Sequence, residues 1–201
     1  MIISSGLSKW AGAGGWQSGT FNFPENLRWL QNAKAIVASE TFTSTSAPIQ
    51  YAAITAFQDN PEIDTYLHHV RRVFKTLGNY MANRLKAKNI SMPSPKGGFY
   101  LFLNFQFYRE KLASKGILTS FELCETLLQE TGIAILPGSD FGRQPEELTC
   151  RLAYVDFDGV LVLNKAMTEY NETPLDEEFL KKYCGKMLEA LIKLEDWLEN
   201  L

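Results

Sequence analysis

One apolar stripe between positions 61 and 89 constrains this chain more than any other feature of its sequence. Its members follow one another at steps of three or four residues: Ile63, Leu67, Val70, Phe74, Leu77, Met81 and Leu85. That spacing places them on one face of an α-helix. Pro61 suits the first turn of such a helix because its missing N–H would have no helical partner there. The pattern predicts one long helix that can connect two lobes.

The sequence on either side of this helix predicts two differently built parts. Residues 1–24 are expected to form strand, loop and strand, and residues 25–57 a helix broken by the hydroxyl-rich segment 39–48. After the turn cluster 92–98 the pattern favours an α+β lobe. Its expected elements are strands at 99–105, 132–136 and 148–155, a weaker strand at 160–163, and helices at 120–130 and 173–198. The predicted division is therefore 1–60, 61–89 and 90–201.

Composition and charge exclude several classes of protein. The 201 residues carry a net charge of −3, and no stripe of lysine and arginine points to nucleic acid. No apolar run approaches the roughly 18 residues of a membrane helix, and the first residues lack the basic region of a signal peptide. The cysteines Cys124, Cys150 and Cys184 lack metal-ligand spacing, so we expect reduced thiols in a cytoplasmic protein and no metal site.

A lysine stands at the start of a glycine-rich stretch near the beginning of the chain. In SSGLSKWAGAGGWQSG, Lys9 follows an expected strand and precedes four glycines. A lysine that is partly desolvated at such a place has a lowered pKa, and its amine becomes a nucleophile toward carbonyl groups. Glycines allow the backbone to turn through positive φ and to approach a ligand closely. Taken alone, the same motif is also compatible with an ordinary surface turn.

Further segments occur in a set order along the chain and carry a resemblance to a known family. They read SETFTSTSAPIQYAAITAF, PKGGFYLFLNF, TGIAILPGSDFG and TCRLAYVDFDG. Together with the lysine segment they resemble the class I/II (fold type I) aminotransferases, which depend on pyridoxal 5′-phosphate (PLP). The resemblance covers nearly the whole chain. It implies the C-terminal part of an α/β PLP-dependent transferase fold: a remnant of the large domain, the long connecting helix and a complete α+β small domain.

The resemblance also implies roles for individual residues. Lys9 matches the lysine that forms the Schiff base with PLP and then moves a proton between substrate and cofactor. Ser8 and Gln17 occupy cofactor-binding positions, and Arg151 matches the arginine that binds the substrate α-carboxylate. An ordinary ion pair on a strand is the other interpretation of Arg151. The implied reaction moves an amino group between an α-amino acid and a 2-oxo acid, in a cytoplasmic enzyme that forms a homodimer.

The sequence departs from the family pattern in three places. Gln17 stands where most members have an arginine on the PLP phosphate, and Gly6 stands where many have a serine. Only eight residues precede Lys9, so the upstream contacts to the cofactor have no counterpart. We therefore expect a truncated chain that is inactive alone, with residues 1–57 as its least stable part. A non-catalytic association module, or a related PLP lyase or synthase on the same fold, are the alternatives.

Overall fold

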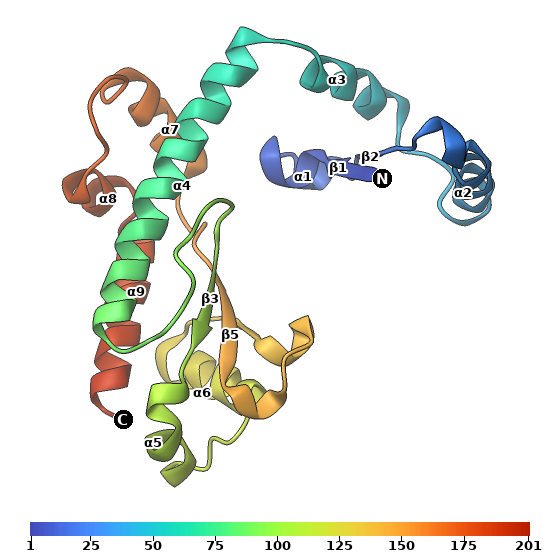
Figure 1. The fold of residues 1–201 in the computed structure, drawn as a ribbon. Helices are drawn as coiled ribbons and strands as arrows, with labels where there is room; N and C mark the ends of the chain where they lie inside the picture. Colours follow the sequence, from blue (N-terminus) through green and yellow to red (C-terminus); the bar gives the residue numbers. More distant parts are fainter. The chain divides into compact units, whose positions relative to one another are not determined.

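The computed structural model describes residues 1–201, which form two units, Met1–His68 and His69–Leu201. Each unit has its own secondary structure, and both are drawn in Figure 1. No helix combines the length and the apolar character needed to cross a membrane. The three-part division at residues 60 and 89 remains a prediction.

The first unit begins with the expected strand, loop and strand. Strand β1 (Ile3–Gly6) pairs antiparallel with β2 (Gly19–Asn22), so that Gly6 lies opposite Gly19. The connection between the two strands contains the one-turn helix α1 (Leu7–Trp10) and the 3₁₀ turn η1 (Gly14–Trp16). After η2 (Glu25–Leu27), the broken helix is confirmed as α2 (Arg28–Thr41) and α3 (Ala47–Phe57).

The long helix predicted from the apolar stripe is confirmed as α4 (Pro61–Ala87). Asn60 starts it by accepting a hydrogen bond from the Glu62 backbone N–H at 2.9 Å. Acidic side chains occupy its first turn and basic ones its last, which suits the helix dipole. Burial is concentrated in its later half, where the buried apolar residues are Val73, Leu77, Met81, Ala82 and Leu85.

The second unit is built on a three-stranded antiparallel sheet in the order β3–β5–β4. Its strands are β3 (Tyr100–Asn104), β4 (Leu136–Pro137) and β5 (Thr149–Ala153). Buried and half-buried residues alternate along β3, as expected for a strand with one face on the core. Helix α6 (Ser120–Thr131) lies beside the sheet in Figure 1, and α9 (Gly185–Glu199) runs along α4. The remaining elements are η3 (Gln106–Tyr108), α5 (Arg109–Ser114), η4 (Gly138–Phe141), η5 (Pro145–Glu147), α7 (Gly159–Thr168) and α8 (Glu177–Tyr183).

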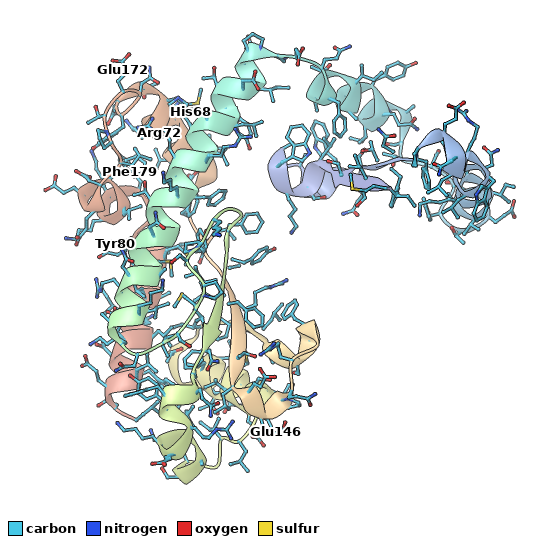
Figure 2. The ribbon with its side chains drawn as sticks, in the orientation of Figure 1. His68, Arg72, Tyr80, Glu146, Glu172 and Phe179 are labelled. Atoms are coloured by element: carbon cyan, nitrogen blue, oxygen red, sulfur yellow. The ribbon has the colours of Figure 1, made fainter.

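Arginines of α4 connect this helix to the C-terminal helices. The Arg72 guanidinium donates to the backbone carbonyls of Tyr170, Asn171 and Thr173 at 2.7, 2.9 and 2.5 Å, and Figure 2 shows Arg72 beside this α7–α8 connection. Lower on the helix, Arg84 forms an ion pair with Glu195 of α9, which is 5% exposed. This pair raises the pKa of Arg84, chiefly through the hydrogen bond from its guanidinium to the carboxylate.

Three predictions for the second unit were wrong in detail. Residues 160–163 were expected as a strand but belong to α7, because Asp158 accepts a hydrogen bond from the Leu161 N–H and starts a helix. Val162 and Ala166, four residues apart, are the buried residues of that helix. The apolar run that reads as a strand is thus the inner face of a helix.

The other two corrections concern strand length and a helix break. The expected strand at 132–136 is paired only at Leu136–Pro137, and its residues alternate in exposure because one face of the antiparallel sheet packs on the core and the other faces solvent. The last helix starts after Asp176, whose carboxylate accepts from the Phe179 N–H, rather than after Thr173. It also breaks at Cys184, which separates α8 from α9.

Candidate active site

Lys9 lies on the single helical turn α1, directly after strand β1. The turn is fixed by Leu7, which is 1% exposed and whose carbonyl accepts hydrogen bonds from the N–H groups of Ala11 and Ala13 at 3.2 and 3.1 Å. Lys9 itself is exposed and the neighbouring Ser8 is half-buried. The structure therefore places the lysine where the sequence predicted, at the junction of strand and glycine loop.

Gly12 is the position in this loop where the backbone conformation and the close packing both favour glycine. Its φ is +67°, a left-handed conformation that other residues rarely adopt, and an added Cβ would stand 2.9 Å from the Tyr66 hydroxyl. The same hydroxyl lies 3.5 Å from the Ala11 carbonyl oxygen, and the Trp10 ring contacts the Phe57 ring at a centroid distance of 5.5 Å. The loop is thus held from α3 and from the first turns of α4.

Gln17, the predicted cofactor contact, has its side chain turned onto its own loop. Its Nε2 donates to the Gly14 carbonyl at 3.0 Å, and its backbone is left-handed with a φ of 51°. A Cβ at Gly14 or Gly15 would meet no atom within 4 Å, so the loop backbone is open at these two positions. Gln17 therefore offers a neutral donor that is already engaged within its own loop.

Arg151 lies in the second unit, on the central strand of the sheet. It pairs with Phe102 of β3 on one side and with Leu136 of β4 on the other. Its neighbours Cys150 and Leu152 face the core and are 0% and 5% exposed, whereas Arg151 is half-buried on the other face. The alternation of a β-strand accounts for this difference. The Arg151 guanidinium makes no hydrogen bond or ion pair within residues 1–201, so the ion-pair interpretation fails.

Two aromatic residues beside Arg151 escaped the sequence analysis. The Arg151 Cζ lies 4.5 Å from the ring centroid of Tyr100 and 4.3 Å from that of Phe141. Tyr100 could have been found from strand alternation, since it stands two residues before Phe102 and shares its face. Phe141 gave no such signal, because it comes from η4, whose approach to β5 depends on tertiary packing.

The turn that carries Phe141 is packed tightly on β5. An added Cβ at Gly138 would stand 1.9 Å from the Thr149 Oγ1, a distance that no side chain tolerates. Gly142 closes the turn with a φ of +78° and donates its N–H to the Ser139 carbonyl at 3.1 Å. Thr149 is 3% exposed beneath this turn, and its hydroxyl has no hydrogen-bond partner. The close contact at Gly138 fixes the position of the turn over the strand.

The cysteines of the second unit lie inside it rather than at a reactive surface. The Sγ atoms of Cys124 and Cys150 are 3.5 Å apart, and both thiols are free and buried. The hydrogen bond to Cys124, together with burial, raises the pKa of the Cys150 thiol. Burial also raises the pKa of Cys184 to about 11. The structure holds no cluster of three or more histidine, cysteine, aspartate or glutamate residues suited to a metal ion.

The predicted site residues thus fall into two groups. Lys9, Ser8 and Gln17 share the strand–loop–strand segment of the first unit, whereas Arg151 lies on the sheet of the second unit. Within each group the geometry is defined: an exposed amine on a fixed turn, and a guanidinium with uncommitted N–H groups beside two rings.

Comparison with known proteins places this chain beside one family. The family model described as aminotransferase class I and II matches residues 1–158. The chain is 31% identical over 154 residues to an aspartate aminotransferase of Geobacillus stearothermophilus, covering 76% of this chain and 36% of that protein. It is 28% identical over 145 residues to aromatic-amino-acid aminotransferase 2 of Thermococcus litoralis, covering 72% and 34%.

Solved structures show the same likeness. The aromatic aminotransferase from Pyrococcus horikoshii OT3 matches with a TM-score of 0.71 at 25% identity, over 99% of this chain and 43% of that one. An aspartate aminotransferase from Thermotoga maritima matches in fold with a TM-score of 0.61. The chain spans about a third of the length of the curated relatives it matches.

Proposed function

The chain belongs to the aminotransferase class I and II family, whose members depend on PLP, and from that premise we propose that its residues serve amino-group transfer between an α-amino acid and a 2-oxo acid. Lys9 is the residue that binds PLP covalently and moves the proton. Arg151 binds the α-carboxylate of the substrate. The observation that carries the proposal is the exposed amine of Lys9 on a turn that Leu7 and Gly12 fix in place.

The residues around Lys9 fit attachment of PLP through the amine. Lys9 is exposed, and a Cβ at Gly14 or Gly15 would meet no atom within 4 Å, so the glycine loop is open at these two positions. The Ser8 hydroxyl and the Gln17 amide are neutral donors for that phosphate, and the amide must first leave the Gly14 carbonyl. When bound, PLP supplies an electron sink for the charge that develops at the substrate α-carbon.

The protein residues supply orientation and a proton carrier. In its neutral form the Lys9 amine would take the proton from the substrate α-carbon and deliver it to the cofactor, which is general acid–base catalysis. The planar guanidinium of Arg151 suits a carboxylate, because it can donate two parallel hydrogen bonds and so fix the plane of that group. Lysine could not replace it, because a single ammonium does not fix the carboxylate plane.

We further propose that residues 1–201 alone do not sustain turnover. Phosphate binding at the Lys9 turn relies on neutral donors, and charge-assisted hydrogen bonds are about twice as strong as neutral ones. The proposal includes a homodimer in the cytoplasm. Large exposed apolar side chains on α2 and α3 support self-association, and buried free thiols suit a reducing compartment. The exposed set is Trp29, Ile36, Val37, Tyr51 and Ile54.

The relatives' names suggest donors for the first assays. They read aspartate and aromatic-amino-acid aminotransferase, so aspartate and phenylalanine are the amino acids to assay first, each with 2-oxoglutarate, and residues 1–201 alone are expected to turn over neither. Arg151 binds the carboxylate that both donors share, and it does not choose between their side chains.

The test is covalent capture of PLP by the full chain. The protein is incubated with PLP and reduced with borohydride, and the modified peptide is identified by mass spectrometry. We expect modification at Lys9 to saturate at far lower PLP concentration than at other lysines, and to vanish in Lys9→Ala. Lys96→Ala, which removes another exposed lysine, serves as the matched control and should leave capture unchanged. Equal modification of all exposed lysines would contradict the proposal and favour the non-catalytic association module.

A further inference from the structure

The most specific arrangement outside the Lys9 turn is the aromatic surround of Arg151. We propose that Tyr100 and Phe141 are positioning residues that hold the Arg151 guanidinium between strand β3 and turn η4, with its N–H groups left available for a carboxylate. The inference rests on the proposed function, in which Arg151 binds the substrate α-carboxylate. The two ring contacts, at 4.5 and 4.3 Å from Cζ to the ring centroids, are its basis.

A ring contact holds an arginine without using its hydrogen-bond donors. The attraction acts between the positive charge and the electron-rich ring face, whereas the N–H groups point outward in the guanidinium plane. Two other arginines of this unit are held differently. Arg72 donates to three backbone carbonyls and Arg84 to a carboxylate, so N–H groups of both are already engaged. Arg151 combines two ring contacts with no hydrogen bond or ion pair, which suits capture of an external carboxylate.

The fold fixes both rings independently of any ligand. Tyr100 lies two residues from Phe102, the direct cross-strand partner of Arg151, so β-sheet register places it diagonally beside the arginine. Phe141 reaches the same place from the turn that Gly138 packs onto Thr149. Its ring meets Phe102 edge-on, with centroids 6.1 Å apart and an interplanar angle of 83°. The guanidinium is therefore pre-organised, and binding a carboxylate costs less side-chain entropy.

The expected effect of removing one ring is a moderate loss of carboxylate affinity. Cation–π contacts at partly exposed sites correspond to roughly a three- to tenfold change in an equilibrium constant. Both Tyr100→Leu and Phe141→Leu should therefore weaken carboxylate binding about three- to tenfold. Tyr100→Phe keeps the ring and should bind like the unaltered chain.

The experiment is a titration of the full chain, labelled with ¹⁵N, with pyruvate as the probe. Binding is followed through the Arg151 Nε–Hε signal and the backbone amides of β5. Methyl pyruvate, which lacks the carboxylate, should bind no more than background. Phe107→Leu is the matched control, because Phe107 is an exposed aromatic residue of the same unit whose ring contacts Tyr108. The backbone spectrum of β3 and β5 reports whether each variant is folded.

A second readout tests the ring contacts without any ligand. In the unaltered chain, the ring currents of Tyr100 and Phe141 should shift the Arg151 side-chain protons upfield, and each leucine variant should remove part of that shift. The proposal is supported when the shift and the affinity fall together in the leucine variants and neither changes in Phe107→Leu. It is overturned if folded leucine variants bind pyruvate as tightly as the unaltered chain, or if Tyr100→Phe loses as much affinity as Tyr100→Leu.

The pattern of failure separates this inference from the proposed function. If the unaltered chain shows no Arg151-dependent binding of pyruvate, with Arg151→Lys indistinguishable from it, the carboxylate role of Arg151 fails and the inference fails with it. If Arg151→Lys abolishes binding but the ring variants do not weaken it, the carboxylate role stands and only the positioning role of the rings is wrong.

Discussion

The two units use similar side chains to very different effect. In Met1–His68 the buried apolar residues are Leu7 and Ala53, whereas all the others of the chain lie in His69–Leu201. Large apolar side chains of the first unit remain exposed, among them Trp29 at 66%, Phe42 at 72% and Tyr51 at 74%. Local sequence signals thus form the helices and the strand pair of the first unit. In the second unit the same kinds of residue close a continuous core, which supplies most of the stability of a fold.

The largest expected difference between the units is the free energy of local unfolding of their two sheets. Amides of β3, which is paired with β5 over a buried face, should exchange hydrogen at least about a thousandfold more slowly than amides of β2, a difference of about 4 kcal/mol. Two strands without a covered face have little to oppose local opening. Residue-resolved hydrogen exchange by NMR measures both strands in one sample. Equal protection of β2 and β3 would remove the contrast between the units.

A matched pair of truncations tests the same contrast at single side chains. Ile90 is 0% exposed, so Ile90→Ala should lower the free energy of unfolding of the second unit by about 3 kcal/mol through lost burial and a cavity. Ile36 in α2 is 65% exposed, so Ile36→Ala should change stability by less than about 0.5 kcal/mol. Urea titration followed through the β3 amide signals gives the first value, and α2 signals give the second. A cost at Ile36 similar to that at Ile90 would show that α2 is covered in solution.

Two glycines offer a comparison of packing density. Gly138→Ala should destabilise the second unit by about 2 kcal/mol, because its Cβ meets Thr149 at 1.9 Å and the turn must move. At Gly14 in the first unit an added Cβ would meet no atom within 4 Å, so Gly14→Ala should leave the stability almost unchanged. Thermal unfolding followed by circular dichroism compares the two. A neutral Gly138→Ala would mean that the turn carrying Phe141 is loosely held, which would also weaken the argument for its role beside Arg151.

The smallest expected effect separates charge from apolar burial within the second unit. Arg84→Met leaves the carboxylate of Glu195 buried without its partner. We expect it to lower the free energy of unfolding by about 1.5 kcal/mol, a value kept small because the Arg84 side chain is 40% exposed and solvent screens the pair. Lys193→Met breaks the exposed Lys193–Glu189 pair and should cost no more than about 0.5 kcal/mol. Urea denaturation in low and high salt measures both variants. If Lys193→Met lowered the free energy of unfolding more than Arg84→Met, the burial of Glu195 would not be what makes its ion pair matter for stability.

Particular elements show how far the sequence alone reaches. The spacing of Leu77, Met81 and Leu85 was sufficient for α4, since helix periodicity is a local property. The strand around Arg151 was also predicted in place, and Lys9 was predicted directly after a strand, but the helical turn α1 that carries it was not predicted. The helix at residues 160–163 was not predicted, because a short apolar run is compatible with a strand and with the buried face of a helix. The helix cap formed by Asp158 distinguishes the two in the structure. The break at Cys184 was missed for a related reason, since α8 and α9 both carry apolar residues at helical spacing.

For the candidate site, the sequence determined which chemical groups are available and on which local elements they stand. It placed an amine at the end of a strand and a guanidinium on another strand, and both strands are present in the structure. Only the tertiary structure decided the surroundings of these groups: the exposure of Lys9, the Gln17 amide bound to Gly14, and the rings of Tyr100 and Phe141 at Arg151. Periodicity and capping are read from neighbours in the chain. Side-chain contacts depend on segments distant in sequence, and these meet only when the core closes.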